Sequence, residues 1–177
     1  MKIKTITEID VLVIDDDRHM RSLIRNILFA LGAKDVVEAG DGKHALSELK
    51  AFKPDLILCD LKMAPVGGME FVRQLRADKS NPNRLVPIIM ITAYAELEAV
   101  SRARDSGVNE FMAKPLSAAS LEQRIRRTLE DPRGFVETET YAGPDRRRNK
   151  KGSVNGPERR ATKPHLIKSA ELSAKVK

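Results

Sequence analysis

Five short apolar runs alternate with segments of helical pattern over the first 130 residues, and this alternation limits the possible folds more than any other feature. The runs are apolar at consecutive positions, which indicates strands buried on both faces. We expect strands at residues 11–14, 36–37, 56–59, 88–91 and 110–112. A parallel sheet covered by helices on both sides buries such strands. A helical bundle is the less favoured alternative, because Gly and Pro punctuate the chain too regularly for it.

Helical patterns fill the gaps between these runs. We expect helices at residues 20–31, 41–49, 69–75, 95–106 and 116–130. Asp17 stands just before the first of them and is the expected helix cap, since Asp is a favoured N-cap residue. The sequence therefore predicts an α/β fold, with a doubly wound five-stranded parallel sheet flanked by five helices.

Chemically distinctive residues stand where the expected strands end. Asp15 and Asp16 follow the first strand, Asp60 follows the third, and Thr92 and Lys114 follow the fourth and fifth. The carboxyl ends of neighbouring strands in a doubly wound sheet converge on one crevice, so we expect these side chains to lie together. Three gathered carboxylates repel one another and need a cation. A site of oxygen ligands with room for water suits Mg²⁺.

This order of residues resembles the CheY-like receiver domain of bacterial response regulators, over about residues 8–130. The matching motifs are Val13-Ile14-Asp15-Asp16, Asp60-Leu61-Lys62-Met63, Ile91-Thr92-Ala93 and Lys114-Pro115. The resemblance implies a flavodoxin-like receiver fold and a cis peptide bond before Pro115. In the alternative interpretation these residues are ordinary turn, cap and surface residues. That alternative is disfavoured, because it would have to be true of five positions together.

The receiver resemblance implies a role for each matched acid. Asp60 would be the phosphoacceptor, taking a phosphoryl group from a histidine kinase, a phosphotransfer protein or a small phosphodonor. Asp15 and Asp16 would bind Mg²⁺ together with Asp60 and the backbone carbonyl of Lys62. The bound Mg²⁺ would neutralise charge that develops on the transferring group.

The resemblance also implies a switch beside the phosphoacceptor. Lys114 would pair with the phosphoryl oxygens, and Thr92 would hydrogen-bond one of them. Phe111 would be the aromatic switch residue, on the face of the fourth and fifth helices where partners dock. The loop 63–68 departs from the common receiver pattern, because its proline is displaced by one position and a glycine replaces an acid. We expect a looser loop there.

The composition changes after residue 131. Residues 1–130 carry 20 Lys and Arg against 19 Asp and Glu, whereas residues 131–177 carry 12 against 6 and so account for nearly all of the net charge of +7. The last segment has few large apolar side chains, and it therefore buries too little surface to offset its ordering entropy. We predict a receiver domain over residues 1–131 and a flexible, largely disordered arginine-rich tail over residues 132–177. A short helix over residues 166–177 is the one regular element expected in the tail.

A Gly-Pro-acid-Arg-Arg phrase occurs twice in this tail, at residues 143–147 and 156–160. Each phrase combines a stiff turn, a carboxylate and paired guanidinium groups. Arginine binds guanine O6 and N7 or phosphates, and a carboxylate can accept from the Watson–Crick edge of guanine. The duplication suits a two-fold ligand with several guanines and phosphates. The candidate ligand-binding residues are Tyr141, Asp145, Arg146, Arg147, Arg148, Glu158, Arg159 and Arg160.

Cyclic di-GMP, as its intercalated dimer, fits that description, and the whole chain resembles the CheY-like cyclic di-GMP effectors called Cle proteins. That resemblance implies docking on a flagellar motor switch protein, effects on motility and surface attachment, and recruitment to the flagellated cell pole. Two alternatives remain open for the tail, a solvated basic extension without a specific ligand and a nucleic-acid arm. The second is disfavoured, because each phrase includes an acid that weakens phosphate attraction. If the tail has no function of its own, the chain would be a plain phosphorelay carrier or phosphate sink.

The remaining features indicate a cytoplasmic protein that is not an enzyme. Cys59 is the single cysteine and cannot form an internal disulfide, which favours a reducing compartment. The N-terminus has no apolar signal core, and no apolar run approaches the roughly 18 residues needed to cross a bilayer, so we expect no membrane insertion. We expect a switch protein without a catalytic output domain.

Overall fold

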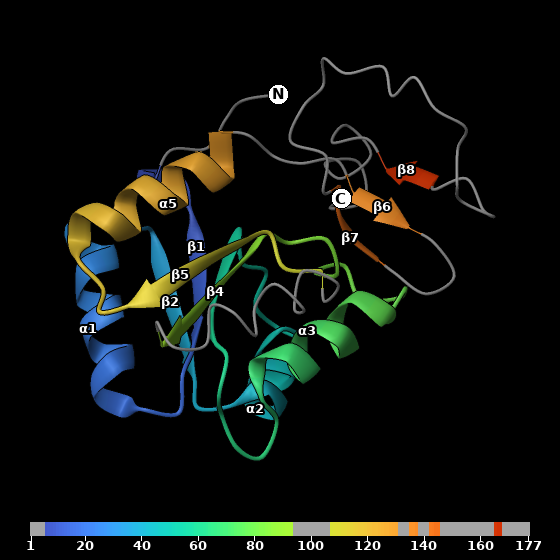
Figure 1. The fold of residues 1–177 in the computed structure, drawn as a ribbon, viewed down its shortest axis with the longest axis horizontal. Coiled ribbons are helices and arrows are strands. Elements are labelled where there is room, and N and C mark those ends of the chain that lie inside the picture. The colour runs from blue at the N-terminus through green and yellow to red at the C-terminus, as the bar shows by residue number, and fades with distance from the viewer. Residues whose placement is uncertain (1–5, 94–106, 131–134, 138–141, 146–164, 168–177) are drawn as a thin grey trace.

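The computed structural model describes residues 6–93, 107–130, 135–137, 142–145 and 165–167. Its centre is a sheet of five parallel strands in the order β2-β1-β3-β4-β5 (Figure 1). The strands are β1 (Asp10–Ile14), β2 (Asp35–Ala39), β3 (Leu56–Asp60), β4 (Ile88–Ala93) and β5 (Glu110–Lys114). This order reverses direction beside β1, so the chain is doubly wound as predicted.

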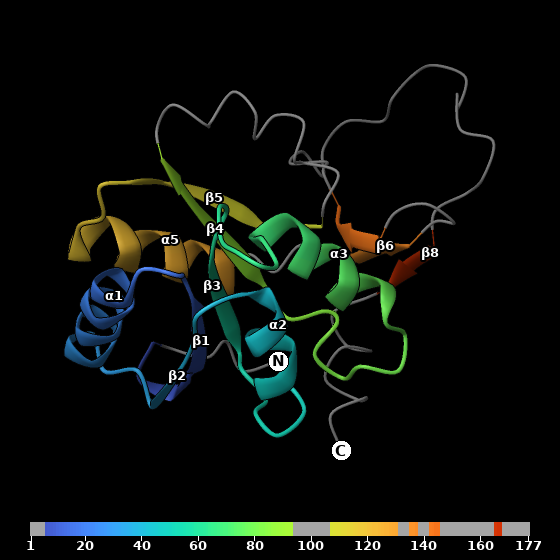
Figure 2. The same cartoon turned by 90° about the horizontal axis from the view of Figure 1, so that it is seen from below.

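Helices cover both faces of this sheet. A short 3₁₀ turn (Ile6–Glu8) precedes β1, and the helices are α1 (Arg18–Ala30), α2 (Gly42–Glu48), α3 (Gly68–Ala77) and α5 (Ala118–Glu130). Figure 2 shows α1 and α5 on one side of the sheet and α2 and α3 on the other. The expected helix at residues 95–106 lies outside the described residues. The predicted α/β fold is confirmed.

Asp side chains begin two of these helices. Asp17 accepts hydrogen bonds from the amides of His19 and Met20 at the start of α1, and Asp41 does the same for the first turn of α2. Each carboxylate satisfies amides that have no partner inside the helix. The caps fix where the chain leaves the sheet, and the first of them immediately follows the acidic pair at the end of β1.

The core has two layers because neighbouring residues of each strand point to opposite faces. Val11 and Val13 pack with α1 and α5, whereas Leu12 and Ile14 pack with α2 and α3. Every residue of β3 is buried, as expected of a central parallel strand. The core is almost entirely aliphatic, and it ends where the polar strand termini begin.

Three short strands follow the α/β body, and they form a separate antiparallel sheet. β6 (Phe135–Glu137) lies between β7 (Ala142–Pro144) and β8 (His165–Ile167). The figures show this sheet beside α3. Phe135 and Val136 are only 3% and 7% exposed. These strands belong to the segment that we expected to be a flexible tail, so that expectation needs refinement.

Side chains at the end of α3 and in the loop that follows explain why β6 is docked. The guanidinium of Arg76 lies 5.0 Å from the ring centroid of Phe135. Arg84 donates to Glu137 at 3.0 Å, and Lys79 lies 3.4 Å from the same carboxylate oxygen. One aromatic side chain and one ion-paired acid thus bind the start of the tail, although the segment as a whole is poor in apolar residues.

The last expected element of the tail is corrected in part. We predicted a helix over residues 166–177, but Leu166 and Ile167 belong to β8 and pair with β6. Backbone hydrogen bonding to a neighbouring strand takes the place of the marginal isolated helix. Residues 168–177 and the expected domain boundary at residue 131 lie outside the described residues.

The described helices are all too short or too polar to cross a membrane.

Candidate functional site

Three predicted residues meet at the carboxyl ends of the central strands. Asp15 directly follows β1, Asp60 is the last residue of β3, and Lys114 is the last residue of β5. The ammonium nitrogen of Lys114 lies 3.0 Å from Oδ2 of Asp15 and 2.6 Å from Oδ1 of Asp60. The fold therefore places two carboxylates around one cation in the crevice that the strand order predicts.

Backbone amides hold the other oxygen of each carboxylate. Oδ1 of Asp15 accepts from the amide of Asp17 at 2.9 Å, and Oδ2 of Asp60 accepts from the amide of Lys62 at 2.8 Å. Asp15 is 1% exposed and Asp60 is 7% exposed. Both carboxylates are thus oriented by the loops that follow their strands, and the remaining oxygen of each contacts Lys114.

Burial and charge act against each other at this site. Desolvation raises the pKa of Asp60 above its ordinary value, although Lys114 and the amide of Lys62 favour the ionised form. Burial works to lower the pKa of Lys114, but its contacts with Asp60 and Asp15 outweigh burial, so that its pKa is raised. The lysine therefore keeps its charge, and Asp60 is a more basic, more nucleophilic carboxylate than one in water.

The neighbouring residues pack tightly under Asp60. The start of α3 lies so close that a Cβ on Gly68 would stand 2.1 Å from the carbonyl oxygen of Asp60. The thiol of Cys59 donates to that same carbonyl at 3.2 Å, and burial raises the pKa of the thiol well above its usual range. Cys59 is therefore an inert core residue. Gly68 was not among the predicted site residues, although the Gly67-Gly68 pair at a loop–helix junction is a visible signal.

The other predicted metal and switch residues lie at more exposed positions. Asp16 and Lys62 are exposed at the mouth of the site, and Phe111 is half-buried. Among the described residues, no group of three or more His, Cys, Asp or Glu side chains is close enough to form a metal centre. The oxygen donors Asp15 and Asp60 suit Mg²⁺ in kind, but Lys114 bridges the two carboxylates.

Thr92 lies on the strand beside Asp60. It is 1% exposed near the end of β4, where the register pairs it with Ala113 of β5, and its hydroxyl lies 3.5 Å from the carbonyl of Ala93. In the register of β3 with β4, Asp60 pairs with Ile91, the residue that precedes Thr92. The cis peptide bond expected before Pro115 is present, and a second one precedes Pro65 in the altered loop.

Most of the predicted tail residues lie outside the described residues. These are Tyr141, Arg146, Arg147, Arg148, Glu158, Arg159 and Arg160. Gly143 and Pro144 of the first phrase are buried residues of β7, and Asp145 directly after them is half-buried. The first phrase therefore begins at a strand that is docked beside the body.

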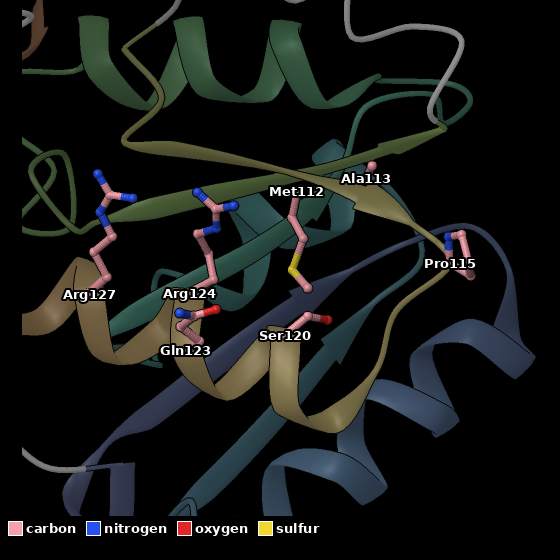
Figure 3. Close-up of a pocket in the computed structure, with 7 residues that line it drawn as sticks. All are labelled: Met112, Ala113, Pro115, Ser120, Gln123, Arg124 and Arg127. Atoms are coloured by element: carbon pink, nitrogen blue, oxygen red, sulfur yellow. The ribbon is translucent and has the colours of Figure 1, made fainter.

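A pocket of about 270 Å³ lies between β5 and α5. Figure 3 shows it lined by Met112, Ala113, Pro115, Ser120, Gln123, Arg124 and Arg127. Arg124 also donates to Glu110 at 3.2 Å, which fixes its guanidinium above the strand. The sequence analysis did not single out these α5 residues, because surface arginines on a helix carry no distinctive pattern.

Comparison with known proteins identifies the family to which this fold belongs. The family profile described as the response regulator receiver domain matches residues 11–126. The chain belongs to the response regulator receiver family. The matched range includes Asp15, Asp60 and Lys114, whose side chains converge at the strand ends.

Individual relatives agree with this assignment. Chemotaxis protein CheY-3 of Vibrio cholerae serotype O1 is 34% identical over 120 residues, which are 68% of this chain and 91% of the relative. A solved structure of a putative response regulator from Chloroflexus aurantiacus has a TM-score of 0.64 and 25% identity, covering 70% of this chain and 99% of its own. The receiver domain of a sensor histidine kinase from Pseudomonas aeruginosa, with a magnesium ion coordinated in its active site cleft, has a TM-score of 0.60 and 30% identity, covering 69% and 97%.

The comparisons fix the general role of the chain. A CheY-like receiver acts in two-component phosphorelay signalling, with a histidine kinase or phosphotransfer protein as its upstream partner. The family match ends at residue 126, before the arginine-rich segment.

Proposed function

We propose that this receiver accepts a phosphoryl group on Asp60 and works as a switch protein without a catalytic output of its own. The observation that carries the proposal is the pair of contacts from Lys114 to Asp60 and Asp15, at 2.6 and 3.0 Å. They place one fixed positive charge beside a buried carboxylate nucleophile, which is the arrangement that phosphoryl transfer needs.

The transfer proceeds by direct displacement. An oxygen of Asp60 forms a bond to phosphorus while the bond from phosphorus to the donor histidine nitrogen breaks, and the imidazole, already protonated on its other ring nitrogen, leaves as a neutral ring with the electron pair of the broken bond. Lys114 pairs with the phosphoryl oxygens as they arrive, and the hydroxyl of Thr92 hydrogen-bonds one of them once it turns toward the site. Asp15, Asp16, Asp60 and the carbonyl of Lys62 are the residues that would hold Mg²⁺. When bound, the ion neutralises charge on the transferring group.

The test is phosphorylation by acetyl phosphate in the presence of Mg²⁺, followed by intact mass. Wild-type protein should gain one phosphoryl group, and Asp60→Asn should gain none. Asp78→Asn is a matched control, because it neutralises an exposed carboxylate that accepts hydrogen bonds from Ser80 and is not one of the predicted site residues. Loss of the phosphoryl group in the control as well, or its presence in Asp60→Asn, would reject Asp60 as the acceptor.

We also propose that the arginine-rich tail captures cyclic di-GMP, as a dimer, and that the protein then docks on a flagellar motor switch protein. The two Gly-Pro-acid-Arg-Arg phrases and the net charge of residues 131–177 support the ligand. The pocket between β5 and α5, flanked by Arg124 and Arg127, supports a docking face for an acidic partner segment. Motor docking would tune motility and surface attachment and would recruit the protein to the flagellated pole.

Calorimetry with cyclic di-GMP tests the ligand. The double variant Arg147→Ala/Arg160→Ala should lose binding, whereas Lys150→Ala/Lys151→Ala removes the same charge outside the phrases and should retain it. Equal losses in both variants would indicate general charge attraction. Binding that tolerates any nucleic-acid sequence and falls steeply with salt would replace cyclic di-GMP with a nucleic acid as the ligand.

A further inference from the structure

One arginine on α1 contacts the backbone of the acidic pair. Nη1 of Arg21 lies 2.6 Å from the carbonyl oxygen of Asp15 and 3.3 Å from that of Asp16. The side chain of Arg21 is 18% exposed; its bond to Asp15 is partly buried, whereas its bond to Asp16 is exposed. A single guanidinium nitrogen thus joins two consecutive carbonyls, immediately below the two carboxylates that the receiver site needs.

These carbonyls lie where the sheet can no longer satisfy them. The pairing of β1 with β2 and with β3 ends at Ile14 in both cases. The amide of Asp15 makes one more backbone hydrogen bond, to the carbonyl of Ala39 at 3.2 Å. Backbone carbonyls beyond a ladder need another donor if their chain direction is to be fixed. Arg21 provides that donor from the first turn of α1, which Asp17 has already capped.

Arg21 is itself held from the neighbouring strand. Its Nε lies 3.3 Å from Oε2 of Glu38 on β2, and Nε of Arg25 lies 3.6 Å from Oε1 of the same carboxylate. The planar guanidinium can bind the carbonyls with one nitrogen and the carboxylate with another, whereas a lysine ammonium offers a single point charge. The chain Glu38–Arg21–Asp15/Asp16 therefore connects β2 to the loop after β1.

We propose that Arg21 is a positioning residue for the receiver site: it fixes the backbone of Asp15 and Asp16 so that their carboxylates are set for a divalent cation before the cation binds. The inference rests on the proposed phosphoacceptor function. Without Arg21 the loop must become ordered when the cation binds, and that ordering reduces the apparent affinity. Arg25 shares Glu38 but contacts neither carbonyl, which makes it the matched control.

The experiment is a titration of full-length protein with Mg²⁺ alone, followed by amide shifts in NMR spectra because the chain has no tryptophan. Arg21→Ala should raise the half-saturating Mg²⁺ concentration at least about 10-fold, the scale on which partners behind the ligands act. The half-saturating concentration of Arg21→Lys should lie between those of Arg21→Ala and the wild type, and that of Arg25→Ala should stay within about two-fold of the wild-type value. Equal values for Arg21→Ala and Arg25→Ala would overturn the proposal.

Two further readouts separate positioning from a general loss of structure. Urea unfolding gives the stability of each variant, and acetyl phosphate gives the phosphorylation rate at saturating Mg²⁺. Positioning predicts that saturating Mg²⁺ restores most of the rate in Arg21→Ala; a rate that stays low, with an unchanged half-saturation point, rejects it. If Arg21→Ala does not fold, Arg21→Lys and Glu38→Gln carry the same comparison. A wild-type protein that binds Mg²⁺ normally but is never phosphorylated contradicts the proposed function and leaves the positioning role standing.

Discussion

Phe135 offers the sharpest test of how the tail is joined to the receiver. The ring is 97% removed from solvent and lies under the guanidinium of Arg76, although it belongs to a segment with few apolar residues. Truncating a buried Phe to Ala typically costs about 3–5 kcal/mol, and a desolvated cation–π contact adds about 1–2 kcal/mol. We therefore expect Phe135→Ala to abolish most of the free energy that docks β6.

That loss has an upper bound, because undocking can occur without unfolding the receiver. A protein truncated after residue 131 measures the bound, since it lacks every docked strand. In urea, the free energy of unfolding of Phe135→Ala should be close to that of the truncated form and about 3 kcal/mol or more below that of the wild type. Limited proteolysis should cut the variant near residues 131–145 faster than the wild type, because undocked backbone is accessible.

The chain contains its own control for this prediction. Phe29 on α1 also has an arginine over its ring, with Arg25 at 5.2 Å from the centroid, but it is 42% exposed. Phe29→Ala should therefore cost only about 1 kcal/mol, the scale of an exposed contact. If Phe135→Ala costs no more than Phe29→Ala, and truncation leaves stability unchanged, then β6 contributes nothing to the fold and the docking argument is refuted.

Three further predictions follow from the same contacts. Gly68→Ala should destabilise the protein by about 1–3 kcal/mol in urea and slow phosphorylation, because its Cβ would collide with the carbonyl of Asp60, whereas Gly67→Ala has 3.4 Å of space and should be tolerated. The hydrogen bond from Arg84 lowers the pKa of Glu137, so the stabilisation from this pair is complete above the ordinary pKa of 4.5 and is lost as pH falls through the lowered pKa. The difference in the free energy of unfolding between wild type and Glu137→Gln should therefore vanish in that acid range. A difference that persists in strong acid would contradict the prediction. Lys114→Gln should reduce stability at neutral pH by leaving two buried carboxylates together, and Mg²⁺ should restore more stability to this variant than to the wild type.

The sequence was sufficient for the fold and for the centre of the site. Buried parallel strands are short and continuously apolar, so their ends can be located, and parallel strands bring those ends to one edge. Asp15, Asp60 and Lys114 could therefore be predicted to meet before any distance was known. The Asp17 cap was predictable for a similar reason, because N-capping depends on local residue type.

The features that the sequence did not reveal depend on single contacts that no sequence pattern marks. Arg21 acts on backbone carbonyls, which have no sequence signature, and Phe135 docks as one isolated aromatic that no periodicity marks. The side chain of Asp16 is exposed in the loop after β1, and its role as a metal ligand stays a prediction. Patterns locate strand ends well, but they do not set the direction of a side chain in a loop.

The most direct test of the account is to locate the phosphoryl group after reaction with acetyl phosphate and Mg²⁺. An acyl phosphate on a carboxylate is cleaved by hydroxylamine, and peptide mapping of the resulting hydroxamate identifies the residue that carried it. We predict a single modified residue, Asp60, and a reaction that is lost in Asp60→Asn. A hydroxamate at any other carboxylate of the wild-type protein, with Asp60 unmodified, would contradict the assignment of the receiver site.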